Sequence, residues 1–310
     1  MSGLTTTSGR PVSRLCFGAM QFGGGADKAA SREMYSACRA AGVNFFDTAH
    51  GYTGGLSETW LGACAGPERD DVIIATKVGY TGGAGRKNIL AQFDESRARL
   101  KMETLDILYM HRFDPDTPLE ETFGTLAELR AAGAIRYIGV SNYAAWQVMK
   151  AQSVAAAMGT RIDIIQPMYS LVKRQAEVEL LPMAASENIA VASYSPLGAG
   201  LLTGKDANSG DGRLATDARY AARYGEAWMH QAGAALTALA KKMGCHPATL
   251  AVAWAARHPA VTAPIISARN TDQLAPSLAA MSTKLSDADY AALSALSHTP
   301  PPATDRLEEA

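Results

Sequence analysis

The chain has 310 residues, of which 47% are hydrophobic and 19% are charged, so it is long enough to bury a substantial core. Its formal net charge is −1, and this value excludes the strongly basic classes that bind nucleic acids or membrane surfaces. We therefore expect a globular protein with neither a nucleic-acid partner nor a membrane partner.

A short β-hairpin is predicted at the start of the chain, over about residues 4–12. The Ser8-Gly9 pair is a turn signal, and it separates two short β-compatible pieces that begin at Leu4 and end at Val12.

After the hairpin, short apolar runs alternate with helical patterns. Continuous apolar strands separated by helices indicate a parallel sheet that is covered on both faces. Eight such strands favour an α/β fold of the (β/α)8 TIM-barrel type, formed as a single domain over residues 1–310. The predicted strands are Leu15–Phe17, Val43–Phe46, Val72–Ala75, Leu105–Met110, Ile135–Val140, Ile162–Ile165, Ile189–Ala192 and Ala263–Ile266.

The clearest predicted helix runs from Thr117 to Ala132. Thr117 is the expected N-cap, Pro118 the first helical residue, and Glu120 the second half of a capping box, while Gly133 ends the helix. The other predicted helices are Arg32–Ala41, Ile89–Lys101, Ala144–Met158, Ala176–Glu187, Glu226–Met243 and Pro247–Arg257.

Two segments interrupt this alternation. Residues 205–225 have no convincing helical or strand period, and we expect a mobile loop that either is plain surface or borders the active site. The C-terminal tail over about residues 298–310 contains three consecutive prolines, which exclude a helix at the prolines themselves. The tryptophans are expected to pack, Trp146 and Trp254 within the core and Trp60 and Trp228 against it.

The cysteines and histidines give no metal or disulfide signal. The four cysteines are scattered without a C-x-x-C pair, and the six histidines lack zinc spacing, so we expect reduced thiols and no metal site. The sequence shows neither the charged and apolar regions of a signal peptide nor an apolar stretch that could span a bilayer. We expect a cytoplasmic protein.

Polar or ionisable residues directly follow most of the predicted strands. In a TIM barrel the active site lies at the carboxyl ends of the strands, so these positions are the candidates for chemistry. Asp47, Lys77 and His111 follow three successive strands, and burying such groups without partners would cost several kcal/mol each. Ser141-Asn142, Gln166, Tyr194-Ser195 and Ser267 occupy the corresponding places on four other strands.

These residues can form a proton-donating assembly. Tyr52 lies five residues after Asp47, so its loop can fold back over the strand ends. A nearby Lys77 ammonium, oriented by Asp47, is expected to lower the pKa of the tyrosine from its usual value of about 10. His111 could then donate a hydrogen bond to a substrate carbonyl, and a hydride cofactor would complete the reaction. The alternative is a buried ionic network that serves only stability.

Several motifs resemble the aldo-keto reductase superfamily, in order from about residue 10 to about residue 280. Asp47 to Tyr52 (DTAHGY), followed by Ser57-Glu58, resembles its most recognisable motif. The remaining similar blocks are Leu15–Gly23, Ala75–Lys77, Tyr109–Pro115, Ile135–Tyr143, Gln166–Ser170, Ser193–Lys205 and Ser267–Leu274.

The resemblance implies an NADPH-dependent reductase that acts on a small carbonyl substrate. Tyr52 would be the general acid, Lys77 and Asp47 would tune it, and His111 would orient the carbonyl. The resemblance also implies the residues that contact NADPH. These are Gly18, Met20, Asp47, Ser141, Asn142, Gln166 and Tyr194 at the nicotinamide, Ser195, Leu197, Gly198, Leu201, Gly204 and Lys205 along the pyrophosphate, and Ser267, Arg269 and Gln273 near the adenosine phosphate.

Two other functions remain open. Lysine at a barrel strand end also suits a Schiff-base aldolase that uses Lys77. A cofactor-binding regulatory subunit without significant turnover is the third hypothesis, because some relatives of the superfamily serve ion channels in this way. The sequence does not identify the physiological substrate or the oligomeric state.

Overall fold

The computed structural model describes residues 3–204 and 217–309. It contains an eight-stranded sheet of parallel strands in the order β7-β6-β5-β4-β3-β2-β1-β8. The strands are β1 (Cys16–Gly18), β2 (Phe45–Asp47), β3 (Ile73–Val78), β4 (Leu105–Met110), β5 (Ile135–Ser141), β6 (Ile164–Gln166), β7 (Ala190–Val191) and β8 (Ile265–Ile266). Each of them lies within or beside an apolar run from which it was predicted.

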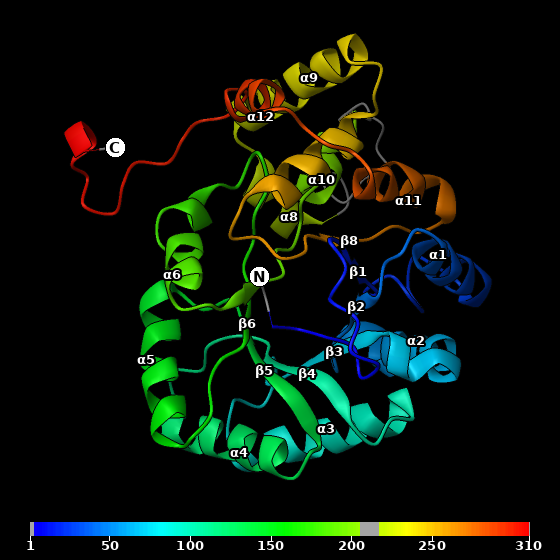
Figure 1. Ribbon diagram of the computed structural model, residues 1–310, viewed down its shortest axis with the longest axis vertical. Coiled ribbons are helices and arrows are strands. Elements are labelled where there is room, and N and C mark those ends of the chain that lie inside the picture. The colour runs from blue at the N-terminus through cyan, green and yellow to red at the C-terminus, as the bar shows by residue number, and fades with distance from the viewer. Residues whose placement is uncertain (1–2, 205–216, 310) are drawn as a thin grey trace.

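Backbone hydrogen bonds between residues in or beside β7 and residues in or beside β8 close the sheet. Ile265 N donates to Ser193 O at 2.8 Å, and Ala263 N donates to Val191 O at 3.1 Å. Figure 1 shows the helices arranged around the outside of the strands. The predicted (β/α)8 barrel is therefore confirmed.

The helices that follow the strands form the outer layer. They are α1 (Lys28–Ala40), α2 (Leu56–Ala65), α3 (Arg86–Leu100), α4 (Leu119–Ala131), α5 (Ala145–Ala157), α6 (Leu180–Ser186), α8 (Ala218–Tyr224), α9 (Ala227–Lys242), α10 (Pro247–Arg257), α11 (Thr271–Leu278) and α12 (Asp287–Ser294). Short 3-10 helices complete the description, namely η1 (Tyr52–Gly55), η2 (Gly66–Asp71), η3 (Gln175–Glu177), η4 (Gly198–Thr203), η5 (Ala279–Met281) and η6 (Leu307–Glu309).

The N-terminal hairpin is confirmed and covers one end of the barrel. Thr6 N donates to Arg10 O at 2.8 Å, and Gly9 has a positive φ of 85° at the turn. Leu4 is buried in a cluster with residues that point into the barrel, such as Phe45 and Ile107. The chain accordingly begins near the centre of the ring of helices in Figure 1, while the C-terminal tail extends outward.

Alternating residues of each strand divide the core into two clusters. Phe45, Ile73, Tyr109 and Ile164 belong to the cluster inside the barrel. Their neighbours in sequence, such as Phe46, pack against the helices. Because successive side chains of a strand point to opposite faces, this alternation also decides which polar residues face the barrel interior.

Several predicted details are wrong. Helix α4 begins at Leu119 with Pro118 as the N-cap residue, and the Thr117 hydroxyl donates instead to Asp114 Oδ2 at 2.6 Å, so the expected capping box does not form. Helices α2 and α12 were not predicted. The buried face of α2 consists mostly of small or polar residues, such as Ser57 and Gly62, which give no clear apolar stripe.

The loop expected at residues 205–225 is only partly described. Residues 205–216, and with them Lys205, lie outside the described residues. Residues 218–224 form helix α8, for which Asp217 is the N-cap, so the expectation of an irregular loop is wrong for that part.

The predicted positions of the tryptophans are confirmed for three of them and wrong for one. Trp254 is fully buried, stacks on Tyr169 and donates to Ser294 Oγ at 2.8 Å, whereas Trp146 is 63% exposed, which corrects its predicted core position. Trp60 and Trp228 are partly buried against the outer core cluster, as expected. None of the described helices has the length and the apolar character that a membrane span requires.

Candidate active site

A buried ion pair lies at the carboxyl ends of β2 and β3. Lys77 Nζ donates to a carboxylate oxygen of Asp47 and, at 2.7 Å, to Thr48 O. Gln166 Nε2 donates to the other Asp47 oxygen at 2.9 Å. Burial alone would lower the pKa of Lys77, but Asp47 and Tyr52 together raise it above its ordinary value. Lys77 is therefore a fixed positive charge inside the barrel.

Tyr52 lies on a tight turn directly above this pair. The turn is held by His50 N, which donates to Lys77 O at 3.0 Å, and by the Thr53 hydroxyl, which donates to Phe22 O at 2.7 Å. Lys77 Nζ lies 5.1 Å from the centroid of the Tyr52 ring. Burial raises the pKa of Tyr52, and the opposing effect of Lys77 is smaller. The expected net lowering of this pKa is therefore wrong, and the phenol keeps its proton.

His111 follows β4 and faces Tyr52. The two ring centroids are 5.7 Å apart, with an interplanar angle of 81°. Burial, together with the charges of Lys77 and Arg112, lowers the pKa of His111 to about 3. The imidazole is therefore neutral near pH 7 and offers one N–H donor. Its Nδ1 atom has no hydrogen-bond partner within residues 3–204 and 217–309.

A second layer of buried bonds supports these residues, and sequence reasoning gave it no role. Glu58 is fully buried and accepts hydrogen bonds from the Thr76 hydroxyl at 2.6 Å and from Arg99 at 3.1 Å. Arg99 also donates to His50 O at 3.0 Å, two residues before Tyr52. This network ties the loop of Tyr52 to strand β3, which carries Lys77. The Ser57-Glu58 pair was visible in the motif, but its partners are distant in sequence.

The chain matches the family model of the Aldo/keto reductase family over residues 14–298. It belongs to this family. Two of its relatives are proteins named as probable voltage-gated potassium channel subunit beta. The one from Oryza sativa subsp. japonica is 34% identical over 80% of this chain and 81% of its own length, and the one from Arabidopsis thaliana is 33% identical with the same coverage.

Other relatives carry enzyme names. Norsolorinic acid reductase from Aspergillus flavus (strain ATCC 200026 and equivalents) is 34% identical over 68% of this chain and 60% of its own length. An uncharacterized oxidoreductase of Bacillus subtilis (strain 168) is 34% identical over 66% of this chain and 69% of its own length. Aldo/keto reductases are oxidoreductases that generally use NAD(P)H, and this chain is a member of that enzyme family.

Most of the residues expected at the nicotinamide lie close together around the ion pair of Asp47 and Lys77. The Ser141 hydroxyl donates to Gln166 O at 3.0 Å, and Asn142 Nδ2 donates to Ser141 Oγ and to His111 O. The Tyr194 hydroxyl donates to Asn142 Oδ1 at 2.8 Å. Gly18 pairs with Asp47 in the sheet, and Met20 follows two residues later, partly exposed.

The residues expected along the pyrophosphate follow β7. Ser195 has a positive φ of 61°, and Leu197, Gly198, Leu201 and Gly204 lie in or beside η4. Gly198, Gly200 and Gly204 also have positive φ values, of 55°, 105° and 73°. A backbone path with repeated positive φ values suits glycine, because residues that carry a side chain rarely adopt positive φ.

The residues expected at the adenosine phosphate follow β8. Arg269 N donates to Gln273 Oε1 at 3.3 Å, and Asn270 caps the N-terminus of α11. The Arg269 side chain passes within 3.2 Å of the position that a Cβ on Gly25 would take, so it lies against the β1–α1 loop. The Ser267 hydroxyl is buried and has no partner among the described residues.

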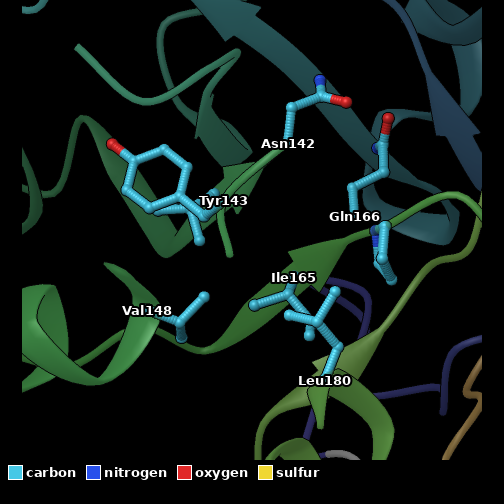
Figure 2. A pocket seen from close by; sticks show the side chains of 8 residues that line it. Asn142, Tyr143, Val148, Ile165, Gln166 and Leu180 are labelled. Atoms are coloured by element: carbon cyan, nitrogen blue, oxygen red, sulfur yellow. The ribbon is translucent and has the colours of Figure 1, made fainter. Parts of the chain in front are cut away.

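A small pocket lies beside the nicotinamide group of residues, between the strands and helices α5 and α6. Figure 2 shows the amides of Asn142 and Gln166 on one side and the apolar side chains of Val148, Ile165 and Leu180 on another. Its lining comes mainly from the outer core, so we do not assign the carbonyl site to it. The four cysteines are unpaired, and no group of His, Cys, Asp or Glu residues in the described ranges has the arrangement of a metal site.

Proposed function

We propose that this protein is an NADPH-dependent reductase that converts aldehydes or ketones to alcohols. Tyr52 gives its phenolic proton to the carbonyl oxygen, while His111 donates a hydrogen bond to the same oxygen. The observation that supports this most directly is that the Tyr52 phenol and the His111 imidazole lie 5.7 Å apart, measured between ring centroids, beside a buried ion pair. When bound, NADPH supplies the hydride.

The ion pair has a separate part in this proposal. Asp47 keeps Lys77 protonated and in place, and the ammonium stabilises the negative charge that Tyr52 acquires as its proton leaves. Because the ammonium and the carboxylate are both buried, their effect on the phenol is less screened than it would be in water.

The residues at the ends of β5–β8 fit a dinucleotide. The side chains that would hold its nicotinamide are Ser141, Asn142, Gln166 and Tyr194, with Gly18 and Met20 beside them. The turns after β7 can follow its pyrophosphate. Arg269, the unpartnered Ser267 hydroxyl and the N-terminus of α11 offer the positive charge and donors that a 2′-phosphate requires, so NADPH is proposed over NADH.

The substrate is proposed to be an aromatic carbonyl compound. The Tyr80 ring is 51% exposed and lies 4.9 Å from the His111 ring, so it offers a face on which a planar substrate can stack beside the proton donors. The exposed Arg112 guanidinium lies 5.2 Å from the Tyr80 centroid. An added carboxylate on the substrate should therefore improve binding, because a cation is available at this edge.

The direct test is consumption of NADPH, followed by its absorbance, with a panel of aromatic, aliphatic and sugar aldehydes and ketones. We expect turnover with several of them, the best being an aromatic aldehyde. Tyr80→Ala should raise the KM for aromatic substrates more than for aliphatic ones. If no member of the panel is reduced while NADPH binds, the reductase proposal is overturned.

A cofactor-binding subunit without significant turnover is the second candidate, because two relatives that match over 80% of this chain are named as channel subunits. The same assay separates the two functions, since such a subunit would bind NADPH without consuming it. A Schiff-base aldolase is disfavoured by the geometry. Lys77 is buried, charged and bonded to Asp47 and Thr48, whereas that chemistry requires a neutral amine within reach of the substrate.

We further propose that residues 1–310 form one domain and that the protein is cytoplasmic. Cys64 and Cys245 are unpaired although they are only partly buried, which is typical of proteins in a reducing compartment. Cell fractionation would test the location, and a single cooperative unfolding transition would test the domain assignment.

A further inference from the structure

Tyr109 is a buried tyrosine directly below the catalytic layer, and the proposed reaction gives it no role. In the sheet it pairs with Lys77 on one side and with Gly139 on the other. It is fully buried among the side chains that fill the barrel. Its hydroxyl is buried and lies near the side chain of Gln166.

Gly139 creates the space that the Tyr109 ring occupies. A Cβ atom on residue 139 would lie 2.3 Å from Tyr109 Cδ1 and 2.6 Å from Cε1, far inside van der Waals contact. The ring is therefore pressed against the backbone of β5. Any larger residue at position 139 would displace it toward the barrel axis or toward the ion pair.

Two aromatic rings flank the Lys77 ammonium. Nζ lies 5.1 Å from the Tyr52 centroid and 5.9 Å from the Tyr109 centroid, while Asp47 and Thr48 O accept its hydrogen bonds. Tyr52 belongs to the reaction, so Tyr109 is the ring that covers the ammonium from within the barrel. Both rings lie within about 6 Å of the cation, the range in which the face of an aromatic ring attracts it.

We propose that Tyr109 is a positioning residue for Lys77: its ring, held in place by Gly139, closes the barrel below the ammonium and keeps water away from the buried ion pair. Water that entered there would screen the charge of Lys77 and would allow the side chain to shift. This proposal rests on the proposed reductase function, because its effect is measured on the proton donor Tyr52.

The chemistry of Tyr109 itself is consistent with a passive ring. Burial raises the pKa of Tyr109 well above its ordinary range, so it stays protonated and does not act as an acid or a base at working pH. Tyr109→Phe should therefore preserve the role of the ring.

The test compares Tyr109→Leu with Tyr109→Phe and with a matched control, Phe123→Leu. Phe123 is equally buried but packs in the outer cluster, on α4, away from the ion pair. For Tyr109→Leu we expect kcat to fall about 10- to 100-fold with little change in KM, the size of effect that a small displacement of a catalytic group produces. Tyr109→Phe and Phe123→Leu should keep kcat within about twofold, although Phe123→Leu lowers the melting temperature.

The pH profile separates positioning from stability. The groups that face Tyr52 are Lys77, Asp47, His111, Tyr194 and Tyr220. Of these groups, Lys77 is the one that Tyr109 covers, and its charge favours the phenolate of Tyr52. If water screens this charge in Tyr109→Leu, the alkaline limb of the kcat profile should move to higher pH. The limb should stay in place in Tyr109→Phe and Phe123→Leu. The same shift can be measured without turnover by ultraviolet titration of phenolate in each variant. Subtracting the titration of the same variant that also carries Tyr52→Phe isolates the signal of Tyr52.

Gly139→Ala tests the contact from the other side. In the wild-type background it should reproduce the loss and the pH shift of Tyr109→Leu. In the Tyr109→Leu background it should cost little more, because the clash with the ring is gone and the two effects are not additive.

The outcomes are distinct. Equal profiles for Tyr109→Leu and Phe123→Leu, or additive losses in the double variant, would overturn the positioning role while leaving the reductase intact. A loss in Tyr109→Phe as large as in Tyr109→Leu would show that the hydroxyl acts instead of the ring. A wild type without turnover refutes the reductase proposal, and the phenolate titration then decides whether Tyr109 positions Lys77.

Discussion

Two regions of the barrel mouth are built in different ways. The catalytic layer, formed by Asp47, Tyr52, Lys77 and His111 after β2–β4, contains a buried ion pair whose side chains bond to each other, to Gln166 and to the backbone of Thr48. The cofactor arc, formed by residues 194–204 and 267–273 after β7 and β8, is built from turns with positive φ and from an exposed arginine.

The difference follows from what each region has to recognise. Proton transfer requires side chains in one geometry before the substrate arrives, so burial and redundant bonds are useful there. A phosphate is recognised by backbone N–H groups and by cations that can remain solvated until it binds. We therefore expect changes in the catalytic layer to affect turnover or stability, and changes in the cofactor arc to affect cofactor binding alone.

The largest effect is expected for Tyr52→Phe, which removes the proton donor but keeps the ring. We expect kcat to fall by about 10² to 10⁴, the usual contribution of a positioned general acid, with the NADPH dissociation constant nearly unchanged. Steady-state kinetics and fluorescence quenching measure the two quantities. The control is Tyr137→Phe, since the Tyr137 hydroxyl bonds to the hairpin at the opposite end of the barrel. Full activity in Tyr52→Phe would contradict the assignment of Tyr52 as the proton donor, and with it the distinction between the catalytic layer and the cofactor arc.

Arg269→Ala tests the cofactor arc. Removing a charged hydrogen-bond donor should weaken NADPH binding by about 1.5–3 kcal/mol, while NADH binding and kcat at saturating cofactor barely change. Dissociation constants for both cofactors, measured on the same protein, provide the internal control. Equal losses for NADPH and NADH, or a wild type that prefers NADH, would contradict the proposed 2′-phosphate site.

Glu58→Gln tests the support of the catalytic layer. The substitution leaves Arg99 with a weaker acceptor and places an amide N–H near donors, so we expect a loss of about 1–3 kcal/mol in the free energy of unfolding. Glu95→Gln is the matched control, because Glu95 pairs with the same arginine but is 57% exposed. Its loss should be clearly smaller, because an ion pair exposed to water contributes little to stability. Urea denaturation of both variants measures the difference, and equal losses would mean that burial of Glu58 has no special value.

The last effect concerns pH. The pKa of His111 is lowered to about 3 in the folded protein, so between that value and the unfolded pKa of about 6.5 the unfolded chain binds more protons at this site. Stability should therefore decrease as pH falls through this window. His111→Asn should flatten the dependence of the melting temperature on pH between about 6.5 and 4. An unchanged slope would show that His111 is protonated in the native state.

Local patterns were sufficient to predict the barrel and the positions at its mouth. Apolar runs separated by helical periods are local features, and strand order in a barrel follows chain order. Asp47, Lys77 and His111 each end a strand, so their meeting followed once the fold was known. Helix α12 was missed although Ser286 and Asp289 form a capping box that could have indicated it.

The sequence by itself therefore determined the fold class and the chemical groups at the strand ends, because both depend on periodicity along the chain. Tertiary structure decided the contacts between distant residues: the Glu58–Arg99 pair, the exposure of Trp146, and the fit of Tyr109 against Gly139. It also decided the direction of the pKa shift of Tyr52, since burial and the charge of Lys77 oppose each other there. Which of two opposing effects is larger depends on three-dimensional distances and on the exclusion of water, and neither quantity is written in a local pattern.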